Sequence, residues 1–166
     1  MRNRKGEMPD WLRLIIKVAV IAAVAVVLLV FVGTLHRVSG NEMYPALKDG
    51  DLCITYKLEP YNVGDVVVYE MDGETHVARV AAINFDSISV TDAGVELNNG
   101  LASEEVFYET HPVEGGMVSY PYSVMEDEVF VLNDYRLNTH DSREFGAVAK
   151  PNLKGKLIFA LRRRGF

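Results

Sequence analysis

The stretch that decides the fold is "VFVLNDYRLNTHDSREFG", residues 129–146. It opens with an apolar, β-branched run, Val129–Leu132, which is typical of a buried strand. Two polar patterns follow, N-D-x-R at 133–136 and T-x-D-S-R-x-x-G at 139–146. The probability that a pattern of this length and order arises by chance is low. This stretch is therefore the most specific guide to the fold.

Short β-rich runs lie on both sides of this stretch, and no long amphipathic helix follows residue 35. Gly-Asp turns precede two of the runs, and the region from Leu97 to Met125 is expected to be a loop-rich insert with a short edge strand. The predicted strands lie within residues 51–58, 65–71, 75–83, 87–91, 128–134 and 153–161. We therefore predict a compact, mostly-β domain over residues 35–166.

An apolar run, "LIIKVAVIAAVAVVLLVFVG", extends from Leu14 to Gly33 with Lys17 as its one charge. A helix of about 20 such residues spans a bilayer core. A cleaved signal peptide would be shorter and end in small residues, whereas bulky residues and Arg37 follow here. We predict a transmembrane anchor at 13–34 in the plasma membrane, with residues 1–12 cytoplasmic and the β domain extracellular.

Composition narrows the chemistry. The formal net charge is −6 and residues 1–34 are basic, so the β domain is acidic and nucleic acid is not an expected partner. The single cysteine, Cys53, lies in a strand-like run and is expected to be a buried thiol. His36, His111 and His140 show no metal-ligand spacing, so no metal or cofactor is predicted.

A second distinctive stretch, "GNEMYPALKDGD" at residues 40–51, follows the apolar run, and "VGDVVVYEMDGETHVARVAAI" at 63–83 comes next. Together with residues 129–146, these blocks resemble type I signal peptidases, which have an S26-type serine peptidase fold. The resemblance runs from about Leu35 to the C-terminus. It implies a signal-peptidase-type β domain.

In that family, a serine directly before Met-x-Pro attacks the peptide bond, and a lysine directly before Arg-Val accepts its proton. A hydroxyl needs such a base to become a nucleophile. In this sequence the nucleophile position holds Glu42 and the base position holds Ala78. The resemblance therefore implies a scaffold without its catalytic dyad. The candidate cleft residues are Met43, Tyr44, Pro45, His76 and Thr139.

The third block matches the family at positions that the resemblance assigns to structure. Asp141 and Arg143 are implied to form an ion pair, with Ser142 between them. Thr139 stands where the family has a serine that orients the lysine, and Asn133 and Tyr135 depart from the family's residues. The implied structural motif consists of Asp134, Arg136, Asp141, Ser142, Arg143 and Gly146.

Other residues could supply chemistry. His76 is expected to share a strand face with Ala78, and Arg79 is expected to point away from it. His76 lies three residues before Arg79, too early for the family's base, and Ser39 lies three residues before the nucleophile position. Glu42 could act as a nucleophile or base, although a lone carboxylate suits glycosidic better than peptide chemistry.

A glutamate before Met-x-Pro and a small residue before Arg-Val also resemble a subgroup of the family. These are the dyad-lacking signal-peptidase-like proteins that act in pilus assembly in Gram-positive bacteria. The resemblance implies a non-cleaving membrane protein whose partners are secreted preproteins or pilins, with the sortase pilus machinery as a further candidate. The alternative is an active type I signal peptidase with an unconventional dyad, or one in which Glu42 and Ala78 were engineered. A third reading is a structural module without a cleft.

Overall fold

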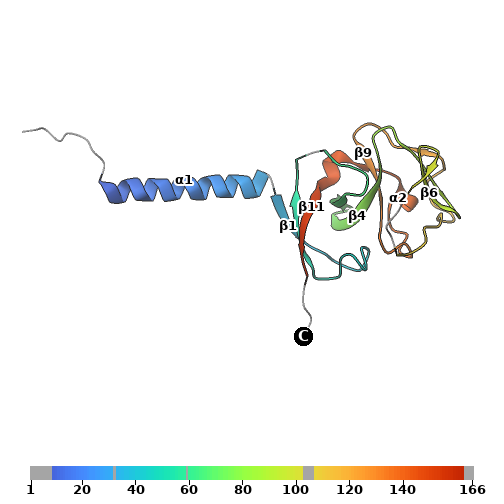
Figure 1. Ribbon diagram of the computed structural model, residues 1–166, viewed down its shortest axis with the longest axis horizontal. Helices are drawn as coiled ribbons and strands as arrows, with labels where there is room; N and C mark the ends of the chain where they lie inside the picture. The colour runs from blue at the N-terminus through green and yellow to red at the C-terminus, as the bar shows by residue number, and fades with distance from the viewer. Residues whose placement is uncertain (1–8, 32, 59, 103–106, 163–166) are drawn as a thin grey trace, which may run out of the picture.

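The computed structural model describes residues 9–31, 33–58, 60–102 and 107–162, which form one helix and a β domain (Figure 1). Helix α1, Asp10–Phe31, projects from one end of the domain, and its first turn carries the acidic Asp10. The chain then passes into β1, Gly33–Arg37. Within the described part of the chain, no helix meets the length and hydropathy needed to cross a membrane.

The bounds of the helix differ from the predicted segment 13–34. The helix begins at Asp10, and by Gly33 the backbone is already a strand paired with Tyr56 of β2. Gly33 permits this pairing because an added Cβ would lie 3.2 Å from the Thr55 carbonyl oxygen. The apolar run is therefore shared between a helix and the first residue of the sheet.

The larger sheet has the strand order β1-β2-β11-β3-β4-β9-β10, with every neighbouring pair antiparallel. Its central strands are apolar on both faces, and buried side chains pack above and below them. Beyond β1, the members are β2 (Leu52–Tyr56), β3 (Val66–Met71), β4 (Glu74–Ile83), β9 (Glu128–Leu132), β10 (Val148–Ala149) and β11 (Leu153–Leu161).

A smaller sheet, in the order β7-β6-β5-β8, lies at the end of the domain opposite α1 (Figure 1). Its inner face packs on β9 through Ile88, Val90 and Phe130. The strands are β5 (Ser87–Thr91), β6 (Gly94–Leu97), β7 (Gly100–Leu101) and β8 (Tyr122–Ser123). A helical turn, α2 (Ser142–Phe145), and a 3-10 turn, η1 (Lys150–Asn152), complete the fold.

The prediction of a mostly-β domain is confirmed, and each of the six predicted runs contains a strand. β6 and the short β10 were not predicted, and neither was β1, which lies under the end of the apolar run. Part of the predicted insert, residues 103–106, lies outside the described residues.

Candidate active site

The loop after β1 holds its shape through its own backbone and one buried side chain. Gly40, at φ 81, donates its N–H to Asp49 Oδ1 at 3.0 Å. Leu47 N–H donates to the Met43 carbonyl at 2.8 Å, which closes a turn around Pro45. Met43 is fully buried in the cluster that contains Leu47. Because Met43 points into the core, the position of Glu42 beside it is fixed.

Glu42 meets His76 of β4. Glu42 Oε1 lies 3.4 Å from His76 Nδ1, and these side chains are 17% and 12% exposed respectively. The Glu42 carbonyl also accepts a hydrogen bond of 2.9 Å from the Tyr135 N–H, which links this loop to the loop after β9. The Glu42 carboxylate is therefore already paired with a partner side chain.

Ala78 lies two residues beyond His76 on β4, and alternate residues of a strand share a face. Opposite these residues on β3 stand Tyr69, paired with His76, and Val67, paired with Ala78. Ala78 is fully buried and packs in the apolar cluster of Val67 and Tyr69. Its methyl group has no atom that could accept a proton.

Arg79 points to the other side of β4, as the alternation of the strand predicts. Its Nε and Nη2 donate to the two carboxylate oxygens of Asp134 at 2.8 and 2.6 Å, and Nη1 donates to the Gly64 carbonyl at 2.9 Å. This forked geometry is the preferred one for arginine and carboxylate. Arg79 is thus committed to Asp134, and Glu42 has His76 instead.

Aromatic residues that the sequence did not reveal surround His76. The Tyr69 ring stacks on it with centroids 5.4 Å apart, and His140 meets its edge at 5.7 Å. His140 Nδ1 in turn lies 3.3 Å from Glu144 Oε2. Burial raises the pKa of Tyr69, and the carboxylates of Glu42 and Asp141 add to this effect. The Tyr69 phenol therefore stays protonated and is not a base at neutral pH.

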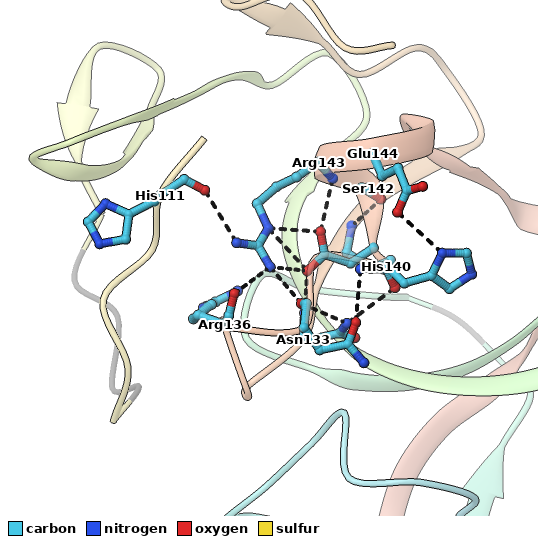
Figure 2. Close-up of polar contacts among 10 residues, drawn as sticks. His111, Asn133, Arg136, His140, Ser142, Arg143 and Glu144 are labelled. Atoms are coloured by element: carbon cyan, nitrogen blue, oxygen red, sulfur yellow. Dashed lines mark hydrogen bonds and ion pairs between the residues drawn. The ribbon is translucent and has the colours of Figure 1, made fainter. Parts of the chain in front are cut away.

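Asp141, the N-cap of α2, and Arg143, in α2, form a fully buried ion pair (Figure 2). Arg143 Nε lies 2.9 Å from Asp141 Oδ1, and Nη2 lies 2.9 Å from Oδ2. The same carboxylate accepts from the Arg143 and Asn133 backbone N–H groups, each at 3.0 Å. Asp141 thereby caps α2 and ties the loop to the end of β9.

Further contacts of this loop are with the backbone. Arg143 also donates to the carbonyls of Arg136 and Asn138, at 3.0 and 2.8 Å. Ser142 Oγ accepts a 2.9 Å hydrogen bond from the Val131 N–H of β9, and Ser142 is fully buried. Ser142 therefore closes the loop onto the sheet and is not exposed to any substrate.

The structure gathers some of the candidate residues and leaves others apart. Glu42 and His76 are in contact and form one partly exposed wall, with Met43 buried beneath and Tyr44 and Pro45 exposed beside it. Ala78 lies on the same face of β4 as His76 but is fully buried. Thr139 is exposed, and only its carbonyl is bonded, to the Asp141 N–H at 2.8 Å. His140 and Tyr69 were missed, because they come from elements whose pairing the sequence alone does not specify.

The chemistry available here is limited to a carboxylate beside an imidazole. Among the described residues, no serine, threonine or lysine side chain bonds to Glu42 or His76. No group of three or more His, Cys, Asp or Glu in the described part of the chain could hold a metal ion. The wall can bind through Glu42 and His76, but it presents no hydroxyl paired with a base.

Comparison with known proteins gives a consistent picture. The sequence pattern of the family described as "Signal peptidase, peptidase S26" matches residues 10–161. Signal peptidase I of Bacillus caldolyticus is 30% identical over 174 residues, covering 95% of this chain and 91% of its own. A Staphylococcus aureus protein named "Inactive signal peptidase IA" is 22% identical over 166 residues, covering 86% and 89%.

A solved structure of signal peptidase I from Enterococcus faecalis superposes with a TM-score of 0.51 at 21% identity. The superposition covers 60% of this chain and 98% of that one. At this identity the match establishes the fold, a mostly-β domain of signal-peptidase type.

Proposed function

The chain belongs to the signal peptidase family, peptidase S26, and from that premise we propose that it is a non-cleaving member that binds secreted polypeptides at the membrane. One observation carries this proposal. Glu42, which the flanking motif aligns with the family's serine, is paired with His76 at 3.4 Å. We propose that Glu42 and Ala78 stand at the positions of the family's serine and lysine. Without a hydroxyl and a base together, peptide-bond attack by the family's route is not available.

The proposed binding surface is the wall around Glu42. Tyr44 is 38% exposed beside the buried Met43, so this side chain is open to a binding partner. Glu42 and His76 keep partial exposure and can bond to a peptide backbone or a cationic side chain. Secreted preproteins are the proposed partner class. Within this class we propose pilins in particular, with the sortase pilus machinery as a further partner.

We place the domain against the membrane through α1, whose sequence run from Leu14 to Gly33 carries Lys17 as its one charge. A second feature supports this placement. Leu35, Ile54 and Phe159 stand side by side across β1, β2 and β11, and they are 61%, 38% and 55% exposed. These strands lie at the end of the domain nearest α1 (Figure 1). An exposed apolar row beside an apolar helix fits a surface resting on a bilayer.

Site-directed photocrosslinking tests this proposal. A benzophenone amino acid at Tyr44, in the full chain in its native membrane, is expected to capture a secreted precursor that carries a signal peptide. The matched control is the same label at Phe85, which is 74% exposed at the turn before β5. If Tyr44 captures no more secreted protein than Phe85 does, the binding role is wrong.

The second candidate, an active peptidase, rests on the contact between Glu42 and His76. A carboxylate and an imidazole at this distance could together accept a proton from water. This reading predicts cleavage that is lost in both Glu42→Gln and His76→Ala. If Glu42 and Ala78 were engineered into an active enzyme, the genomic codons at positions 42 and 78 would encode the natural residues instead.

A further inference from the structure

A pocket of about 480 Å³ lies where β1 and β11 end. Its walls are Arg37, Gly50, Leu52, Leu161 and Arg162. Arg37, Leu52 and Leu161 stand opposite one another across three neighbouring strands, on the face that also carries the apolar row of Leu35. Leu52 and Leu161 are 36% and 49% exposed. The pocket thus joins two guanidinium groups to an apolar wall.

Both arginines are available to an outside anion. Neither Arg37 nor Arg162 has a carboxylate partner among the described residues. Arg162 Nη2 donates one long hydrogen bond, of 3.5 Å, to the Ala46 carbonyl. Lys48 shares a neighbouring pocket with Arg162 and adds a third positive charge nearby. In a chain whose net charge is −6, the lining of this pocket holds two arginines and no carboxylate among the described residues, which calls for an anionic ligand.

The position of the pocket selects the kind of anion. Arg37 comes four residues after Gly33, which corresponds to roughly 13 Å along a strand. The headgroup layer on each side of a bilayer is on the order of 5–8 Å thick. A strand inclined to the membrane therefore keeps the Arg37 side chain within reach of lipid phosphates. The leucines would face the glycerol and upper acyl region.

We propose that this pocket binds the phosphate of an anionic phospholipid headgroup between Arg37 and Arg162, with Leu52 and Leu161 against the lipid's apolar part. Arginine's planar fork matches phosphate oxygens in a bidentate manner. This inference rests on the proposed membrane placement of the domain. Its consequence is a fixed orientation of the Glu42 wall relative to the membrane surface.

The test uses the detergent-solubilised full chain and native mass spectrometry. Short-chain phosphatidylglycerol, phosphatidylcholine and inorganic phosphate are titrated separately. We expect phosphatidylglycerol to bind more tightly than either of the others, and Arg37→Gln with Arg162→Gln to lower its affinity by roughly tenfold or more. The matched control, Lys150→Gln with Lys154→Gln, removes the same charge from outside the pocket. The control is expected to bind as the parent does.

Other outcomes overturn the inference. Equal binding of both lipids, or an unchanged affinity in the arginine variant, removes the headgroup site. An equal loss of lipid affinity in the control variant would show that net charge alone causes the effect. Inorganic phosphate that binds as tightly as the lipid would show a simple anion site. Melting curves show whether the variants are folded. Release of the parent chain from membranes at alkaline pH would contradict the anchor, yet selective lipid binding in detergent would still stand.

Discussion

At the scale of single residues, the proposal concerns Glu42 and Ala78, which we place where the family has a serine and a lysine. Glu42 has a partner in His76, and Ala78 packs in the apolar cluster of Val67 and Tyr69. His76 and Ala78 share a face of β4. The scaffold around them, with Met43 buried beneath the loop, is in place.

The double variant Glu42→Ser with Ala78→Lys is expected to restore weak cleavage of a preprotein, whereas each single variant is expected to remain inactive. A hydroxyl needs a base within about 2.6–3.2 Å, and the lysine must lose its proton near pH 7. That requires a pKa about three pH units below its ordinary value, which the apolar surroundings of position 78 favour. Thr139, exposed and without a side-chain bond, weighs against full recovery.

Product formation, followed by electrophoresis of a labelled precursor, checks this expectation. The control is Glu42→Ala with Ala78→Lys, which supplies the base without the hydroxyl. Activity in either single variant, or in this control, would show that the residue-by-residue alignment is misplaced.

At the scale of elements, the loop after β9 and the start of α2 are joined by the buried pair of Asp141 and Arg143. Replacing Asp141 or Arg143 by alanine leaves the other charge buried without its partner, which costs roughly 3–5 kcal/mol of unfolding free energy. Glu42→Ala is expected to change stability little, because Glu42 and His76 keep partial exposure. Thermal or denaturant unfolding of the purified variants measures these differences.

An exposed ion pair provides the comparison. Lys154 Nζ and Glu70 Oε2 lie 2.5 Å apart, and their side chains are 35% and 45% exposed. Glu70→Ala should therefore cost about 1 kcal/mol or less. If Asp141→Ala and Arg143→Ala cost no more than Glu70→Ala, the loop does not have the structural role assigned to it.

His36 of strand β1 makes the stability of the domain depend on pH. Burial lowers the pKa of His36, and the positive charges of Lys57 and Lys154 add to this effect. Below about pH 6.5 the unfolded chain therefore binds a proton that the folded chain resists, so stability falls as pH decreases through this window. His36→Gln is expected to lose less melting temperature between pH 7.5 and 5 than the parent does.

The exposed His111 serves as the control for this effect, since its side chain is 55% exposed. His111→Gln should follow the parent curve. Identical curves for the parent and His36→Gln would contradict the role of His36.

The six longer predicted strands were predictable because each carries its own signal, a β-rich run set off by a turn, whereas β1, β6 and β10 were not predicted. The pairing was not predictable, because β11 lies between β2 and β3 although it comes last in the sequence. For the same reason the approach of Arg79 to Asp134, and of His140 to His76, could not be read from spacing. The proposal that Glu42 and Ala78 stand at the dyad positions came only from the motifs that flank them.

At the scale of the whole molecule, α1 and the apolar row of Leu35, Ile54 and Phe159 are expected to keep the chain at the membrane. The full chain should stay in the membrane pellet after alkaline carbonate extraction. Ile21→Lys with Val24→Lys places two charges in the apolar run, at a cost of roughly 2.5–3.5 kcal/mol each near a helix centre, and should release the protein. Leu101→Lys with Met117→Lys, at exposed apolar positions of the β domain, is the charge-matched control. Release of the parent chain would contradict the anchor.

The most direct test of the central claim is an endpoint cleavage assay with the purified full chain in detergent. A preprotein bearing an Ala-x-Ala site is incubated beside a serine-bearing signal peptidase as positive control. The account predicts that the precursor remains intact with this chain while the positive control converts it to mature protein. Cleavage above background that disappears in His76→Ala or Glu42→Gln would contradict the account.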